Sequence, residues 1–91
     1  MPQSLETRRK RLRYRTSHTG TRETDILVGG FVARNVDGLD EQGINSLEAL
    51  LEDANDRDIL DWITERAPLP KRFRNNTTAS LIAFVKNRPA S

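Results

Sequence analysis

The sequence lacks cysteine, has a single histidine, and contains no long apolar run. Without cysteine the chain can form neither a disulfide framework nor a thiolate metal site, and this composition fits a reducing compartment. One histidine is too few for a typical zinc site. No stretch approaches the roughly 20 apolar residues of a membrane-spanning helix, and no apolar signal region follows the basic N-terminus. We therefore expect a cytoplasmic bacterial protein that binds no metal and does not insert into a membrane.

The sequence also lacks the motifs of common enzymes. It has no glycine-rich phosphate loop. Ser17 and His18 are adjacent in sequence, which usually directs two side chains apart, and no acid is placed to orient the histidine. A chain of 91 residues forms one small domain with a thin core. We expect this domain to span residues 1–91, with flexible ends at 1–3 and 89–91, and to have no enzymatic activity.

Charge is unevenly distributed along the chain, although the formal net charge is only +2. Residues 1–15 hold six basic side chains and one acidic one, residues 37–65 hold ten acidic side chains and one basic one, and residues 66–91 hold six basic side chains only. The stretch "RRKRLRYR" at 8–15 fits either a nucleic-acid-binding helix, with Tyr14 as a stacking ring, or a basic helix that faces the acidic helices of the same chain. The strongly acidic middle favours the second interpretation.

Apolar residues recur at helical spacing along most of the chain, and no stretch alternates with period two. We therefore predict an all-α fold, a compact bundle of four or five short helices. In the second helix the spaced apolar residues are Ile26, Leu27, Phe31 and Val32. The predicted helices are about Ser4–Thr16, about Thr21–Val36, about Glu41–Asp53, a fourth that begins after Asn55, and about Asn76–Asn87.

Local signals mark the helix ends. Ser4, Asp40 and Asn55 are residues that commonly cap helix N-termini, and the run "APLP" ends the fourth helix because proline cannot donate to the helical ladder. Gly29 and Gly30 lie inside the second helix, where each costs about 1 kcal/mol relative to alanine. Such glycines indicate that a neighbouring helix packs closely or that the helix bends.

The polar segment "SHTGTRETD", residues 17–25, separates the first two predicted helices, and we call it the motif segment. Gly20 can be the N-cap of the second helix, with Glu23 placed to reach back to the cap amide and Asp25 favoured by the helix dipole. A second role is compatible with this one. Glycine leaves the backbone bare for a partner, and Arg22, Glu23 and Asp25 would line the approach.

The basic opening, the motif segment and the acidic stretch "SLEALLEDANDRDILDWITERAPLP" together resemble the SdhE family, also called succinate dehydrogenase assembly factor 2, over about residues 8–86. The family motif is Arg-Gly-x-x-Glu, followed closely by an acidic or polar residue. Gly20, Glu23 and Asp25 match this motif. Thr19 stands where the family has arginine, and either neighbouring His18 or Arg22 is a candidate to supply the missing cation.

A second signature of the family lies in and after the fourth predicted helix. Asp58, Trp62, Pro68 and Pro70 fit it. Trp62 is expected in the core, because its spacing from neighbouring apolar residues follows the helical period.

The resemblance implies a helical assembly factor, which we expect to be a monomer and not an enzyme. Members bind the flavoprotein subunit of succinate dehydrogenase, and in some bacteria that of fumarate reductase, and promote covalent attachment of FAD to a histidine of that subunit. FAD would then belong to the partner, and this chain would hold no cofactor stably. The alternative is a small basic-helix module that binds nucleic acid or regulates another protein. The implied partner-binding residues are His18, Thr19, Gly20, Arg22, Glu23 and Asp25.

Overall fold

A computed structural model describes residues 4–17 and 23–88, and this part of the chain contains five α-helices and no strand. The predicted all-α bundle is confirmed, and each predicted helix has a counterpart with similar bounds. Two short 3-10 helices, η1 and η2, were not expected. The elements are α1 (Leu5–Ser17), α2 (Glu23–Asn35), η1 (Val36–Gly38), α3 (Glu41–Asp53), α4 (Asp56–Ile63), η2 (Lys71–Phe73) and α5 (Asn76–Lys86).

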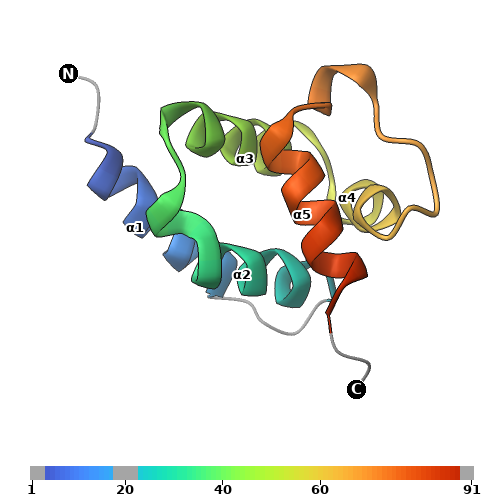
Figure 1. The fold of residues 1–91 in the computed structure, drawn as a ribbon, viewed down its shortest axis with the longest axis horizontal. Helices are drawn as coiled ribbons and strands as arrows, with labels where there is room; N and C mark the ends of the chain where they lie inside the picture. Colours follow the sequence, from blue (N-terminus) through green and yellow to red (C-terminus); the bar gives the residue numbers. More distant parts are fainter. Residues whose placement is uncertain (1–3, 18–22, 89–91) are drawn as a thin grey trace.

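Helix α2 is the centre of the bundle, since α1, α4 and α5 all pack against it. Helix α3 packs against α1 and α5, so α1 bridges α2 and α3 on one side of the molecule. In Figure 1, α2 and α3 lie on opposite sides of the view, and α5 runs from one to the other. The two ends of the motif segment therefore lie on two helices that pack against each other.

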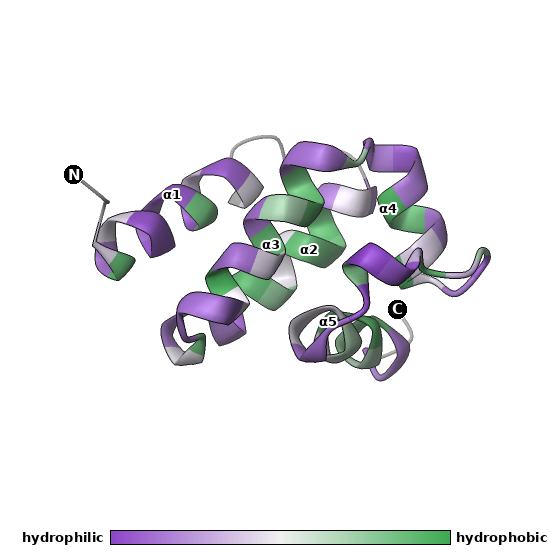
Figure 2. Ribbon diagram, turned by 90° about the horizontal axis from the view of Figure 1, so that it is seen from above, coloured by the Kyte–Doolittle hydropathy of each residue, from purple (hydrophilic) through white to green (hydrophobic). Residues whose placement is uncertain are grey.

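Apolar side chains from every α-helix form one core. Helix α1 differs from the others because Leu12 is its one fully buried apolar side chain, and Figure 2 shows its ribbon to be mostly hydrophilic. Other contacts must therefore hold α1 in place. Trp62 packs against the core without being fully buried. The buried apolar residues are Leu12, Leu27, Val28, Phe31, Val32, Val36, Ile44, Leu47, Leu50, Ile59, Ile63, Phe73, Leu81 and Val85.

The helix caps follow the sequence signals. The side-chain oxygens of Ser4, Asp40 and Asn55 each accept a hydrogen bond from the backbone N–H three residues on, at 2.8–3.2 Å, as predicted for N-caps. Asn75 caps α5 in the same way, at 2.8 Å. The cap predicted at Gly20 lies outside the described residues.

Candidate functional site

The structure describes two of the predicted partner-binding residues, Glu23 and Asp25, and both lie in the first turn of α2. The other four, His18, Thr19, Gly20 and Arg22, lie outside the described residues. Glu23 is exposed and Asp25 is half-buried. Their negative charges are favoured at this position because the N-terminus of a helix carries a partial positive charge.

Glu23 lies on the rim of an open depression of about 240 Å³ between the start of α2 and the ends of α4 and α5. Three cations line this depression with Glu23, namely Arg66, Lys86 and Arg88, together with the carboxylate of Glu65. The depression is open to solvent and mixed in charge. Such a surface fits contact with another protein better than enclosure of a small molecule.

Thr24 anchors the start of α2. Its side chain is buried, and its Oγ1 donates a hydrogen bond to the backbone oxygen of Asp56 at 3.0 Å. This bond fixes the first turn of α2 against the first turn of α4. The sequence analysis did not single out Thr24. The available signal was its spacing, since it lies three and four residues before Leu27 and Val28 on the buried face of α2.

The other end of the motif segment is held by close packing of α1 on α2. A Cβ atom added to Gly29 would lie 2.8 Å from the backbone oxygen of Thr16, so only glycine permits this approach. Thr16 is buried, and its hydroxyl donates to the Leu12 backbone oxygen at 2.8 Å. The close helix packing predicted at the glycine pair is confirmed at Gly29, and the neighbour is α1 of the same chain. The helices on both sides of the motif segment are therefore held by contacts with the rest of the fold.

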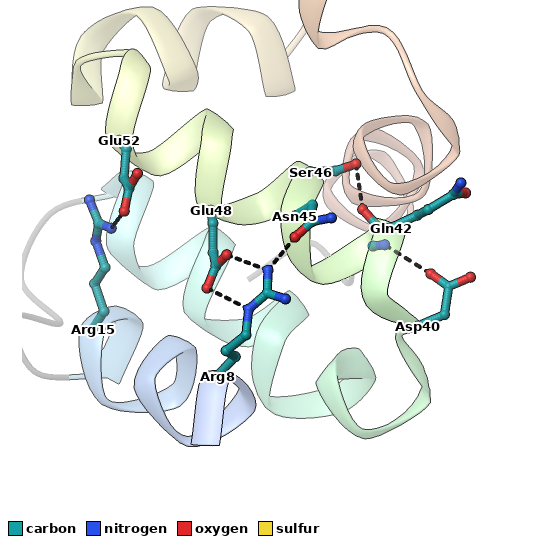
Figure 3. Close-up of polar contacts among 9 residues, drawn as sticks. Arg8, Arg15, Asp40, Gln42, Asn45, Ser46, Glu48 and Glu52 are labelled. Atoms are coloured by element: carbon teal, nitrogen blue, oxygen red, sulfur yellow. Dashed lines mark hydrogen bonds and ion pairs between the residues drawn. The ribbon is translucent and has the colours of Figure 1, made fainter. Parts of the chain in front are cut away.

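Ion pairs and hydrogen bonds join α1 to α3 (Figure 3). The guanidinium of Arg8 donates to both carboxylate oxygens of Glu48, at 2.6 and 3.4 Å, and also to the side-chain oxygen of Asn45. Hydrogen bonding to Glu48 raises the pKa of Arg8 above its ordinary value. Arg15 donates to the backbone oxygen of Leu51 at 2.8 Å and lies 3.9 Å from the carboxylate of Glu52.

Two further arginines join α1 to the turn that follows α2. Arg9 donates to the backbone oxygens of Val36 and Leu39, at 3.2 and 2.7 Å, and Arg13 pairs with the carboxylate of Asp37. Four of the six basic side chains in residues 8–15 thus contact the fold itself. The interpretation of this stretch as a basic helix that faces the acidic helices of the same chain is confirmed for α3.

The second family signature has structural roles. Asp58 donates its backbone N–H to the side-chain oxygen of Asn55, the N-cap of α4. The ring centroids of Trp62 and Phe73 lie 5.4 Å apart, and the guanidinium carbon of Arg72 lies 4.3 Å from the centroid of Phe73. Helix α4 ends at Ile63, and Glu65, two residues further on, is in the left-handed conformation with φ of 63°. These contacts fix the chain between α4 and α5, and they explain why an aromatic side chain is placed at the end of α4.

Two properties of the described residues bear on other classes of function. Within residues 4–17 and 23–88, no group of three histidine, aspartate or glutamate side chains is placed to hold a metal ion. Among the same residues, no helix is long and apolar enough to cross a membrane.

Comparison with known proteins identifies the family. The family described as "Flavinator of succinate dehydrogenase" matches residues 10–85, which include the motif segment, helices α2, α3 and α4, and all of α5 except its last residue. The chain belongs to this family. The resemblance read from the motif segment and the acidic stretch is therefore confirmed.

Individual relatives agree with this assignment. The chain is 44% identical over 68 residues to the FAD assembly factor SdhE of Acetobacter pasteurianus, covering 75% of this chain and 62% of the relative. It is 32% identical over 85 residues to the mitochondrial succinate dehydrogenase assembly factor 2 of Dictyostelium discoideum, covering 93% and 60%. A mitochondrial assembly factor 2-B of Drosophila melanogaster is 33% identical over 84 residues, covering 91% and 54%. The chain thus spans between half and two thirds of these relatives' lengths. No solved structure matches it significantly.

Proposed function

We propose that this chain binds the flavoprotein subunit of succinate dehydrogenase and promotes covalent attachment of FAD to that subunit. The observation that carries the proposal is the family match over residues 10–85, supported by relatives named as assembly factors of the same enzyme. The motif segment is the proposed contact region, with Glu23 and Asp25 at the start of α2 as its described members. The fumarate reductase flavoprotein is a second candidate partner.

The chain acts by binding rather than by catalysis in this proposal. FAD belongs to the flavoprotein, and the chain holds no cofactor of its own. A small protein that binds one conformer of its partner more tightly raises the population of that conformer. The rate of flavin attachment then rises in proportion to the population that is competent for the covalent step. The anchored first turn of α2, which carries Glu23 and Asp25, supports this role, because residues held in one conformation lose less entropy on binding.

The alternative function, nucleic-acid binding, has less support. Four basic side chains of residues 8–15 contact the fold itself, which leaves Lys10 and Arg11 as exposed cations of α1 that form none of these contacts. Nucleic-acid affinity depends on the number of phosphates that cations neutralise. We therefore propose the flavoprotein as the partner, a monomeric state for the chain, and the bacterial cytoplasm as its location.

The proposal is tested by producing the flavoprotein with and without this chain in cells that lack their own assembly factor. Covalent flavin is measured by in-gel fluorescence after denaturation, and the partner is identified by pull-down. We expect strong fluorescence with the wild-type chain and weak fluorescence with Gly20→Arg or Glu23→Ala. Glu41→Ala is the matched control, since Glu41 is also an exposed glutamate in the first turn of a helix, α3. Equal fluorescence with and without the chain would contradict the proposal, and parallel assays with the fumarate reductase flavoprotein decide between the two partners.

A further inference from the structure

Two large apolar side chains are exposed in the described part of the chain, and they flank the motif segment. Tyr14 on α1 is 63% exposed and Ile26 on α2 is 57% exposed. One lies in the helix that leads into the segment, and the other lies in the helix that leaves it. Exposed apolar side chains are ordinary when they are scattered, but both of these lie on the two helices that frame the proposed contact region.

Both side chains point directly away from the core. Residues two positions apart in a helix lie about 200° apart around its axis. The residues two before and two after Ile26 are Thr24 and Val28, and both are buried. Likewise Leu12 and Thr16 are buried on either side of Tyr14. Neither outward side chain can therefore be needed to complete the core.

We propose that Tyr14 and Ile26 are apolar anchors of the contact with the flavoprotein, so that the contact surface includes the outward faces of α1 and α2. This inference rests on the proposed function. Tyrosine is among the residues that dominate binding energy at protein interfaces, and an aliphatic side chain contributes by leaving water. An exposed side chain on an outward helix face suits contact with a folded protein better than enclosure of a small ligand.

The charges around the two anchors indicate the chemistry of the covering surface. Glu23 and Asp25 lie beside Ile26 in the first turn of α2 and disfavour a polyphosphate partner. Lys10 and Arg11 are exposed on α1, within one helical turn of Tyr14. The covering surface is therefore expected to be a protein surface with apolar hollows, with carboxylates opposite α1 and a cation opposite the start of α2.

The test measures affinity for the purified flavoprotein subunit by biolayer interferometry and covalent flavin by in-gel fluorescence. We expect Ile26→Glu and Tyr14→Ala each to weaken binding by at least about tenfold, a loss typical of an interface anchor. Ile26→Leu keeps the apolar area and is expected to bind within about twofold of wild type. The matched control is Ala79→Glu, which adds the same charge at an exposed position of α5 and is expected to leave binding unchanged. Thermal unfolding followed by circular dichroism shows that each variant is folded.

Three results would overturn the inference. If the wild-type chain is active and either the Tyr14 or the Ile26 variant binds with wild-type affinity, the anchor inference is refuted and the proposed function stands. If the wild-type chain neither binds the flavoprotein nor raises its fluorescence, both the anchor inference and the proposed function are refuted. A wild-type dimer that Ile26→Glu converts to a monomer, measured by light scattering with chromatography, assigns the surface to a second copy of the chain instead. A variant that fails to unfold cooperatively is replaced by Ile26→Ser, to which the same criteria apply.

Discussion

The adjacent glycines of α2 meet different neighbours, and alanine at the two positions is expected to change stability in opposite directions. At Gly29 a new Cβ atom would lie 2.8 Å from the backbone oxygen of Thr16. At Gly30 it would lie 3.5 Å from ring atoms of Phe84, which is an ordinary van der Waals distance. The first contact is with a backbone atom and cannot be relieved by turning a side chain. The second requires no movement.

The magnitude follows from two opposing effects. Replacing glycine by alanine inside a helix stabilises the folded state by about 1 kcal/mol, and this gain is common to both positions. Forcing an extra carbon into a packed contact costs about 1–3 kcal/mol. We therefore expect Gly30→Ala to stabilise the protein by up to about 1 kcal/mol and Gly29→Ala to destabilise it by up to about 2 kcal/mol. The difference between the two variants isolates the close contact between α1 and α2.

Thermal and urea unfolding followed by circular dichroism measure this difference. For domains of this size, 1 kcal/mol shifts Tm by about 4–8 °C, so the two variants should be separated by several degrees with wild type between them. Because the contact at Gly29 holds the end of α1 near the motif segment, Gly29→Ala should also lower flavin attachment, whereas Gly30→Ala should not. If Gly29→Ala melted at or above the wild-type temperature, the contact with Thr16 would not constrain the packing of α1.

Three other substitutions test separate parts of the structure. Glu65→Gly should raise stability by about 1 kcal/mol in urea unfolding, because φ of 63° disfavours any side chain, and an unchanged midpoint would contradict this. Thr24→Val removes the donor to Asp56 at a buried position, so it should lower stability by about 1 kcal/mol and reduce covalent flavin fluorescence, whereas Thr24→Ser should retain both. Thr19→Arg restores the cation of the family motif and should tighten flavoprotein binding in interferometry, with a gain that diminishes as salt is added. If Thr19→Arg and wild type bound the flavoprotein with equal affinity at low salt, the last expectation would be refuted.

The helices and their ends were predictable because the signals are local. The caps at Asp40 and Asn55 each bond to an N–H three residues on, so the cap and its partner lie in one short stretch of sequence. The candidate site stays a prediction from the motif, and the structure adds that α2 begins within this segment, at Glu23. The sequence analysis missed Thr24, whose hydrogen bond reaches a residue 32 positions away, and a bond of this kind leaves no local signal.

The sequence by itself determined that this chain forms short helices, where they start and stop, and which family it resembles. Only the tertiary structure decided what lies opposite each helix face. Arg8 meets Glu48 across 40 residues of sequence, which shows that the basic stretch is held by the fold. The sequence groups Ile26 with Leu27, Phe31 and Val32 as the apolar residues of this helix, yet Ile26 faces outward, because the packing of α1, α4 and α5 around α2 selects the covered face. Spacing along a helix gives the relative directions of side chains, and the contacts between helices determine which of those directions is buried.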